Sequence, residues 1–425
     1  MSLIGITIFL FFASTPIYII LLIIFILTKF FYLPEISLHI LMQQIFTGIT
    51  PISFVCIPMF MMAANVIISG SSSQRIVKVL RTYFGHIYGS IPIITTVASM
   101  LFGAISGSTQ ATVAAIGGAM RPILLKTGYS SSFSFGLIIN ASDIATLIPP
   151  GISFVIYGIV AQVSIGKLFL SGIGPGVLIT VIFSIYCYFY SRFKNIGRYP
   201  KIGWKERIKA TKESILLVGF PIIILGGIYG GILSPTEASA VSVVYALFLE
   251  GLCYRSLTVK KLLNCILNTS IVTAITFSMT GTGRALGWLM GYSQLGAKFL
   301  SPILGSEPSA LKIIIVISFT YFILGMFTSP IVGYYIFTPI FAPYIIQAGL
   351  NEILVGVLIV MQSAIASATP PFGCDIFTAM VIFGRPYHEV VRESWPFILL
   401  LLLAYVIVII FPDLALFIPS KAFGV

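Results

Sequence analysis

Long apolar stretches separated by short polar segments dominate the chain, and the apolar residues within them are continuous rather than alternating. A helix needs about 20 apolar residues to cross the hydrocarbon core of a bilayer. Stretches that approach or exceed this length are IGITIFLFFASTPIYIILLIIFIL, GIGPGVLITVIFSIYCYFY, ILLVGFPIIILGGIYGG and PFILLLLLAYVIVII. They predict an all-α polytopic membrane protein, because the strands of a membrane β-barrel would alternate apolar and polar residues.

Composition supports the same class. The chain of 425 residues is 58% hydrophobic and 8% charged, and its mean hydropathy is +1.07. A soluble domain carries roughly 25% charged residues, so most of this chain is suited to lipid. Residues 1–27 lack the basic start of a signal peptide and their apolar run is too long for one, so we predict a first transmembrane helix there.

The formal net charge of +12 comes from basic residues that gather between the apolar stretches. Residues 191–213 hold eight Lys or Arg against two Glu, which predicts a cytoplasmic loop and not a nucleic-acid site. The five cysteines show no C-x-x-C pairing, so neither a disulfide framework nor a metal knuckle is predicted. They are Cys56, Cys187, Cys253, Cys265 and Cys374.

Helix-breaking residues recur at one offset, 221 residues, which indicates an internal repeat of backbone architecture. The remaining side chains differ between the halves, so breaks and turns are repeated while packing residues are not. The matched pairs are Gly70 with Gly291, Pro122 with Pro343, Gly128 with Gly349, Pro149 with Pro370, and Pro150 with Pro371.

The flanks of the two halves carry different charge. The first half has Arg75, Lys78, Arg81, Arg121 and Lys126 beside its breaks, whereas no Lys or Arg lies between residues 312 and 385 of the second. Because basic flanks face the cytoplasm, the halves are predicted to be inverted-topology repeats. Secondary transporters of this architecture bind substrate and coupling ions at the repeat interface.

Each half contains two breaks about 40 residues apart. The first is a Gly/Ser/Thr-rich kink, for which we predict re-entrant hairpins over residues 86–122 and 319–343. The second is a Pro-Pro pair that interrupts a helix. Backbone groups left unpaired at membrane depth must line a cavity or be buried in protein. The carbonyls of residues 147–151 and 368–372 are therefore candidate ligands for a small hard cation, the alternative being kinks that serve packing alone.

A few polar side chains inside apolar stretches are candidates for function. Asp143 and Asp375 lie close to the two Pro-Pro pairs and either contact a bound cation or hydrogen-bond the broken helix. Arg284 is predicted either to contact an anionic substrate or a small second subunit, or to extend to the membrane interface. Glu237 follows Pro235 at a predicted helix start, where the helix dipole stabilises a carboxylate. The candidate substrate-binding residues are Asn140, Asp143, Arg284, Gln362 and Asp375.

Enzymatic chemistry is not indicated. The sequence contains no H-E-x-x-H motif and no P-loop, and its three histidines, His39, His86 and His388, lie near the ends of apolar segments. A membrane enzyme would need a nucleophile or metal constellation, and an ATP-driven pump would need the P-loop. A channel and a transporter driven by an ion gradient remain.

Five motifs, in order, carry a resemblance that extends through nearly the whole chain: SGSTQATVAAIGGAMRPILLKTGYSSSFS, IPPG, SPTEASAVSVVYALF, LGMF followed by TPIFAPYIIQAGL, and TPPFGCDIF. They resemble the large membrane (M, DctM-like) subunit of TRAP (tripartite ATP-independent periplasmic) transporters. The resemblance implies an elevator-type, Na⁺-driven importer in the bacterial inner membrane, with a small four-helix membrane (Q) subunit and a soluble periplasmic substrate-binding (P) protein. It implies an organic-acid cargo of the C4-dicarboxylate or sialic acid type.

The resemblance also implies Na⁺ sites at the two hairpin tips and the two interrupted helices. Two departures bear on them: Gly151 replaces the serine of the common IPPS form, and Thr328 with Ser329 stand where many relatives have an acidic residue. A stand-alone Na⁺-coupled anion transporter is the alternative. The implied Na⁺ ligands are Ser106, Gly107, Ser108, Thr109, Pro149 and Gly151 in the first half, and Thr328, Ser329, Thr369, Pro370 and Gly373 in the second.

The expected organisation has five parts. Scaffold helices occupy residues 1–81, the first transport-domain half 82–170, scaffold and arm helices 171–300, the second transport-domain half 301–390, and a C-terminal helix 391–425. Each transport-domain half is expected to contain one hairpin and one interrupted helix.

Overall fold

The computed structural model describes residues 3–13, 15–196, 199–305 and 308–423, and within these ranges every regular element is helical. Six helices are long and apolar enough to cross a membrane, or eight if each of two bent pairs counts as one span. The predicted all-α polytopic class is therefore confirmed for the described part of the chain.

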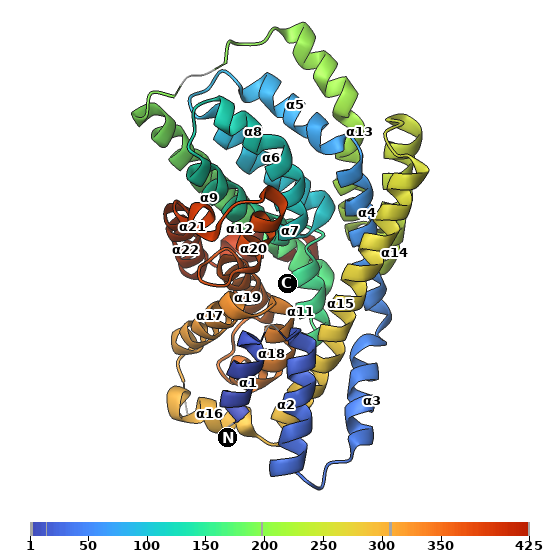
Figure 1. Cartoon of the computed structure of the whole chain (residues 1–425), viewed down its shortest axis with the longest axis vertical. Helices are drawn as coiled ribbons and strands as arrows, with labels where there is room; N and C mark the ends of the chain where they lie inside the picture. Colours follow the sequence, from blue (N-terminus) through green and yellow to red (C-terminus); the bar gives the residue numbers. More distant parts are fainter. Residues whose placement is uncertain (1–2, 14, 197–198, 306–307, 424–425) are drawn as a thin grey trace.

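The N-terminal apolar stretch forms two helices, so the prediction of a single first helix was wrong. Helix α1 (Leu3–Phe12) ends before Pro16, which is the N-cap of α2 (Ile17–Tyr32). Proline has no N–H to donate and disfavours helical geometry in the residue before it, so the helix cannot run through this point. The two helices lie side by side in Figure 1, and α3 (Leu38–Ile49) follows.

The first repeat starts with α4 (Cys56–Ser69) and α5 (Ser72–Phe84), which lead into the predicted hairpin and interrupted helix. The interrupted helix bends by 46° at the Pro-Pro pair. The hairpin consists of α6 (Ser90–Ser106), α7 (Thr109–Thr112), a π-helical turn (Val113–Gly117) and α8 (Gly118–Lys126). The interrupted helix consists of α9 (Ser131–Ser142), α10 (Ile144–Leu147) and α11 (Ile152–Ala161).

Long helices connect the two repeats. Helix α12 (Ile165–Phe193) packs against both of them, whereas α13 (Trp204–Tyr229), α14 (Pro235–Leu247) and α15 (Val259–Tyr292) lie along one side of the molecule in Figure 1. Helix α16 (Leu295–Leu304) leads to the second repeat.

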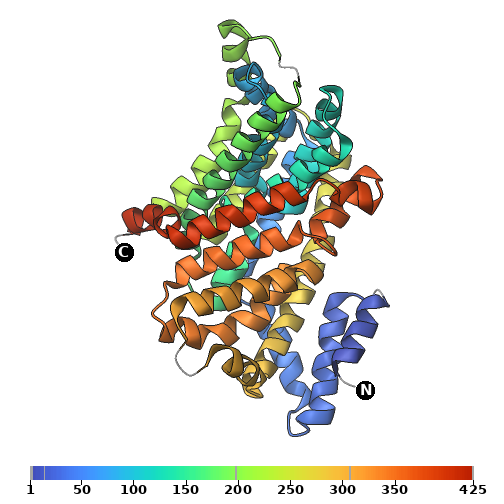
Figure 2. The same cartoon turned by 90° about the vertical axis from the view of Figure 1, so that its left-hand side faces the viewer.

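The second repeat reproduces the bounds of the first at the offset of 221 residues. Helices α6, α8 and α9 end or begin at residues 106, 126 and 131, and α17, α18 and α19 do so at 327, 347 and 352. In Figure 2 these later helices, orange to red, cross the long axis one above another. The elements are α17 (Ala310–Phe327), α18 (Pro330–Gln347), α19 (Glu352–Ser367), α20 (Cys374–Phe383) and α21 (Tyr387–Val391).

The hairpin form of α17 and α18 follows from contacts across their tip. The hydroxyl groups of Tyr321 and Thr338 lie 2.8 Å apart, and the rings of Tyr321 and Tyr334 are 6.1 Å apart. Residues at similar distances on both sides of the tip can meet only if the helices run antiparallel. The arms extend beyond the predicted 319–343, and α17 alone is long enough to cross a membrane.

The predicted C-terminal helix is also divided. Helices α22 (Trp395–Ile410) and α23 (Asp413–Phe423) meet at 54°, because Pro412 follows the last turn of α22 and cannot continue its hydrogen-bond ladder. Helix α23 packs on α12.

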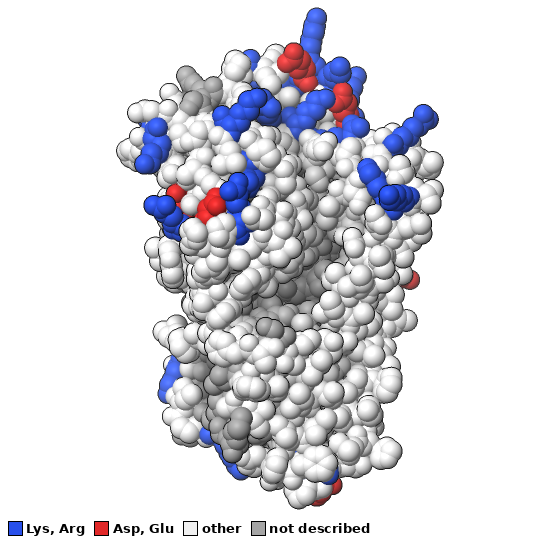
Figure 3. Space-filling view, viewed as in Figure 1, with Lys and Arg blue, Asp and Glu red and all other residues white. Residues whose placement is uncertain are grey.

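Basic side chains gather at one end of the molecule, as Figure 3 shows over α5, α8 and the start of α13. At this end the buried Glu250, just after α14, accepts hydrogen bonds from the backbone N–H groups of Ser71 and Ser72 at 3.0 and 3.1 Å. It also accepts bonds from the Ser72 and Ser256 hydroxyls. A carboxylate at the start of α5 satisfies orphan amide donors, so Glu250 fastens α5 to the α14–α15 hairpin.

Candidate functional site

The two hairpin tips and the two interrupted helices meet at one cavity of about 230 Å³. Helix α15 and Met61 of α4 close its other side, so it lies between the repeat elements and the long helices. A wider depression continues from it, and Figure 3 shows that face hollowed at mid-height. Polar atoms reach the cavity from Ser108, Thr109 and Gln110 (first tip), Thr146 and Ser153 (first interrupted helix), Ser329 and Tyr334 (second hairpin), Ser363 and Ser367 (second interrupted helix), and Thr276 (α15).

The first tip is fastened directly to the first Pro-Pro break. Gly107 ends α6 with φ +57°, and Ser108 caps α7 by accepting a hydrogen bond from the Ala111 N–H. The Gly107 carbonyl accepts a bond from the Ile152 N–H at 3.2 Å, where α11 begins. A Cβ on Gly107 would lie 2.0 Å from the Pro150 carbonyl oxygen. The tip therefore requires glycine for both its left-handed conformation and its close approach to the break.

Replacing Gly107 by alanine is expected to destabilise the protein by more than about 1 kcal/mol and to reduce uptake strongly, because the clashing atom is backbone and φ is positive. Thermal unfolding in detergent and uptake in proteoliposomes measure the two effects. Gly118→Ala is the matched control, since a Cβ there meets nothing within 4 Å in helix α8. Equal behaviour of the two variants would contradict the assigned role of Gly107.

Two buried carboxylates lie behind the cavity. Asp375, fully buried at the start of α20, accepts hydrogen bonds from the Thr109 hydroxyl at 2.7 Å and the Ser367 hydroxyl at 2.6 Å. It thus links the first hairpin tip to the second interrupted helix. Asp143, 1% exposed, lies within hydrogen-bonding reach of the Asp375 carboxyl group, and no other described residue donates to its oxygens. Two ionised carboxylates buried in contact are costly, so either a proton shared between them or a bound cation must offset their charge.

The carbonyls of both breaks accept no hydrogen bond from the part of the chain that the structure describes. This holds for residues 147–150 in the first break and 368–372 in the second. Gly151 explains one departure from the common motif, since a Cβ there would lie 2.1 Å from the Thr146 carbonyl oxygen. Gly373 packs equally closely on the Ser367 carbonyl, at 2.3 Å. A serine at position 151 would need a backbone shift in this structure.

No group of three or more His, Cys, Asp or Glu that could hold a metal occurs in the described ranges. A cation at this place would therefore depend on hydroxyls and carbonyls together with the two aspartates. Unwound backbone carbonyls at interrupted helices are the Na⁺ ligands that such transporters use. The donor set is of the oxygen type that hard cations prefer.

Of the remaining candidates from the sequence, Ser106 and Thr328 lie close to the hairpin tips, whereas Asn140, Gln362 and Thr369 lie outside the cavity wall. Ser106 contacts the Thr112 hydroxyl at 3.2 Å, and Thr328 lines the adjoining depression. Asn140 and Gln362 are buried in α9 and α19 outside the cavity wall, each with its side-chain carbonyl oxygen unpartnered among the described residues. Thr369 donates to the Ile365 carbonyl.

Arg284 does not reach the central cavity and lines a separate one. Glu237 completes a capping box with Ser234 at the start of α14, as its position after Pro235 indicated.

Several cavity residues were not selected from the sequence. Gln110 and Tyr334 come from the hairpins, and Thr276 and Met279 come from α15. The signal that could have found the α15 face is the recurrence of threonine at 269, 276 and 280 within an apolar span, with a spacing that places them on one side of a helix.

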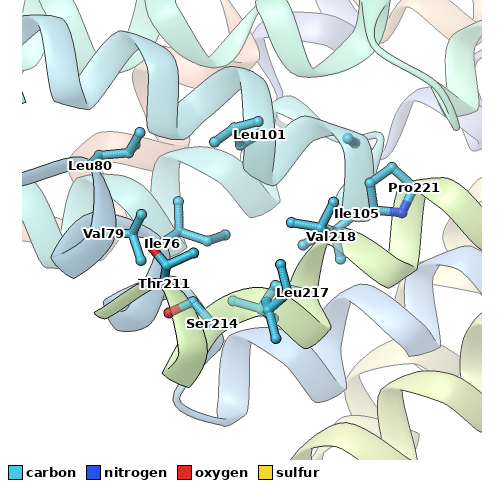
Figure 4. Close-up of a pocket in the computed structure, with 12 residues that line it drawn as sticks. Ile76, Val79, Leu80, Leu101, Ile105, Thr211, Ser214, Leu217, Val218 and Pro221 are labelled. Atoms are coloured by element: carbon cyan, nitrogen blue, oxygen red, sulfur yellow. The ribbon is translucent and has the colours of Figure 1, made fainter. Parts of the chain in front are cut away.

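A second cavity, of about 170 Å³, is almost wholly apolar. It lies between α5, α6 and α13 (Figure 4), and its two polar residues, Thr211 and Ser214, direct their hydroxyls to the carbonyls of Arg207 and Arg75. With no free polar group, it offers an ionised solute no compensation for lost hydration. The central cavity is the better solute site.

Inverted repeats, two helical hairpins and two interrupted helices that converge on one cavity define a polytopic secondary transporter. The chain belongs to the family of the DctM component of tripartite ATP-independent periplasmic transporters, whose family model matches residues 4–414. It is a transporter subunit and not an enzyme. The tripartite family supplies a small membrane subunit and a periplasmic binding protein as partners.

Two relatives are named for the same solute. The ectoine TRAP transporter large permease protein TeaC of Halomonas elongata is 46% identical over 91% of this chain and 91% of its own. The ectoine/5-hydroxyectoine TRAP transporter large permease protein UehC of Ruegeria pomeroyi is 47% identical over 90% of each chain. The crystal structure of the YdaH transporter of Alcanivorax borkumensis shares the fold, with a TM-score of 0.50, 13% identity, and coverage of 90% of this chain and 88% of that one.

Proposed function

We propose that this chain is the large membrane subunit of a Na⁺-coupled importer for a compact zwitterionic organic acid of the ectoine type, in the bacterial inner membrane. The observation that carries the proposal is the central cavity, in which both hairpin tips and both interrupted helices surround one solute-sized space beside the buried carboxyl groups of Asp143 and Asp375. The binding protein delivers the solute to the outer face, and the small membrane subunit extends the scaffold.

The cavity chemistry supports a small polar solute. Hydroxyl and amide groups from both repeats line it, whereas no Lys, Arg or His does. A doubly charged dicarboxylate would find no cation in this wall, while a zwitterion needs no net counter-charge. Ectoine carries a carboxylate on a cyclic amidinium ring, and TeaC and UehC are named for it. Ectoine therefore suits the site better than a C4-dicarboxylate or sialic acid.

Sodium coupling is supported by the free carbonyls and the buried acids. Na⁺ binding beside Asp143 and Asp375 would offset the charge of this buried pair in place of a shared proton, and Thr109 and Ser367 already orient the Asp375 carboxylate. Because Asp375 links the two repeats, an ion bound there would hold the first tip and the second interrupted helix in one body. Such a body could move as the mobile domain of an elevator against α4 and α15.

The test is uptake of radiolabelled ectoine into proteoliposomes that contain this chain with its small membrane subunit. Uptake is expected only with the binding protein outside and an inward Na⁺ gradient, and excess unlabelled succinate or sialic acid should not compete. Uptake without the binding protein would identify the stand-alone alternative. Uptake driven by a proton gradient in choline buffer would exclude sodium as the coupling ion.

A further inference from the structure

Arg284 lines a third cavity, of about 520 Å³, between α11, α15 and α18, which we call the Arg284 cavity. The same three helices line the central cavity with residues 152–156, 272–279 and 330–334. They line the Arg284 cavity with residue 160, residues 284–292, and residues 335 and 339. The two cavities are therefore consecutive along one helical interface.

One face of α15 supplies most of the Arg284 cavity. Arg284, Gly287, Trp288, Gly291 and Tyr292 recur at the spacing of one helical face. The rings of Trp288 and Tyr292 are parallel, with centroids 5.2 Å apart and an interplanar angle of 18°. A Cβ on Gly291 would meet nothing within 4 Å, so this glycine leaves open space beside the aromatic pair.

Two polar side chains, Arg284 and Tyr335, face one another across the Arg284 cavity. The exposed Arg284 guanidinium makes no ion pair or hydrogen bond with a described residue, and it is the only charged group of the lining. The Tyr335 side chain is only 3% exposed, and its hydroxyl lies near the Thr280 hydroxyl and the Arg284 guanidinium. A guanidinium without a carboxylate partner beside a tyrosine hydroxyl suits an anionic group that both can contact.

Adjacent tyrosines of α18 separate the two cavities. Tyr334 lines the central cavity and Tyr335 lines the Arg284 cavity, and both are buried. The Tyr334 hydroxyl lies near the Ser153 and Ser363 hydroxyls, and the Tyr335 hydroxyl lies near that of Thr280. A solute that moves along the α15–α18 interface would therefore exchange one tyrosine hydroxyl for the next.

The Arg284 cavity lies toward the end of the molecule opposite the basic cluster. Helix α15 starts next to Lys260 and Lys261, and Arg284 lies 25 residues after Val259, about 38 Å further along the helix at 1.5 Å per residue. Since the basic end faces the cytoplasm, the Arg284 cavity faces the side from which a periplasmic binding protein delivers its solute.

We propose that Arg284, Trp288, Tyr292 and Tyr335 form an outer receiving subsite that binds the solute before it enters the central cavity. Arg284 and the Tyr335 hydroxyl donate hydrogen bonds to the solute carboxylate, and the Trp288 and Tyr292 rings contact its delocalised cationic ring by cation–π attraction. The identification of the solute as a zwitterionic carboxylate rests on the proposed function, whereas the subsite rests on the cavity.

Trp288 is a built-in reporter for this subsite, because the chain has only three tryptophans. Trp204→Phe combined with Trp395→Phe leaves Trp288 alone, and ectoine added to this variant in phosphatidylcholine nanodiscs is expected to change its fluorescence with saturation. Variants that retain only Trp204 or only Trp395 are matched controls and should not respond, since neither residue lines the cavity. Acetate and the cationic ring compound imidazole test the two halves of the solute separately.

Arg284→Gln in the single-Trp288 protein is expected to raise the half-saturating ectoine concentration about tenfold, as for loss of a charged hydrogen-bond donor, and Arg284→Lys should recover part of the affinity. In proteoliposomes, Arg284→Gln should raise the half-saturating concentration for uptake more than it lowers the maximal rate. If Arg284 had only a structural role, Arg284→Gln and Arg284→Lys would lower the thermal stability of the protein without this selective change in affinity.

Three results would overturn the subsite. The first is an unchanged Trp288 fluorescence at ectoine concentrations that saturate uptake. The second is an unchanged half-saturating ectoine concentration in Arg284→Gln. The third is a Trp288 fluorescence response to phosphatidylglycerol but to no carboxylate, which would make the ligand a lipid phosphate. None of them affects the proposed import of ectoine, which the proteoliposome assay of the unaltered chain decides. Conversely, a Trp288 response to another carboxylate, with no ectoine uptake, would support the subsite and reject ectoine as cargo.

Discussion

Replacing Pro149 and Pro150 together by alanine is expected to abolish Na⁺-driven uptake while the protein still inserts and folds. Alanine is favoured over proline inside a helix by about 3 kcal/mol per residue, so α10 and α11 would join. The Ile152 N–H would then bond the Ile148 carbonyl in place of the Gly107 carbonyl that it contacts now. The break would lose its attachment to the first hairpin tip, and its free carbonyls would enter helical bonds. Uptake and thermal unfolding should be measured on the same preparation.

Two comparisons make this result specific. The equivalent pair, Pro370 and Pro371, should give the same loss if the repeat is functional as well as architectural. Pro221→Ala is the control, because Pro221 lies inside α13 and far in sequence from both breaks. A Pro149/Pro150 variant that is destabilised but keeps a normal Na⁺ dependence would show that the prolines serve packing alone.

Asp143→Asn and Asp375→Asn are each expected to remove the stabilisation that Na⁺ gives to the folded protein. A cation that binds only the native state raises the free energy of unfolding by about 2.7 kcal/mol at 100 times its dissociation constant. Replacing choline chloride by NaCl at equal ionic strength should therefore raise the melting temperature of the unaltered chain but not of either variant. Na⁺-driven uptake should be lost in parallel.

Glu250→Gln is the matched control for the two aspartates. Glu250 is a fully buried carboxylate too, but it binds serine hydroxyls and backbone amides at the start of α5 and does not line the central cavity. Its loss should destabilise the protein while the response to Na⁺ is kept. An undiminished response to Na⁺ in both aspartate variants would place the coupling ion elsewhere.

Local backbone signals explain why the repeat could be predicted from one sequence. Proline lacks an N–H and glycine tolerates positive φ, so both affect the chain within one or two residues of their position. The offset of 221 residues found among them is the offset at which the helix bounds of the two halves coincide. The same rule applied more strictly would have divided the first and last apolar stretches, at Pro16 and Pro412.

Side-chain proximity could not be obtained in the same way. Asp143 and Asp375 are 232 positions apart, and their contact depends on how the interrupted helices α10 and α20 pack, which neither segment specifies locally. Arg284 was a substrate candidate because it is a charge in an apolar span, yet its direction on α15 places it in a cavity of its own. Tyr334 and Tyr335 look equivalent in sequence, and only the packing of α18 assigns them to different cavities.

The sequence by itself determined the membrane class, the inverted repeat, the places where helices break and the family, because hydropathy, charge at the flanks and the Gly and Pro positions act over short distances along the chain. The tertiary structure decided which breaks meet, which buried carboxyl groups come into contact, and which polar groups share a cavity. These depend on contacts between helices that are more than a hundred residues apart, and within the membrane such contacts are set by close packing of apolar faces that many sequences could provide.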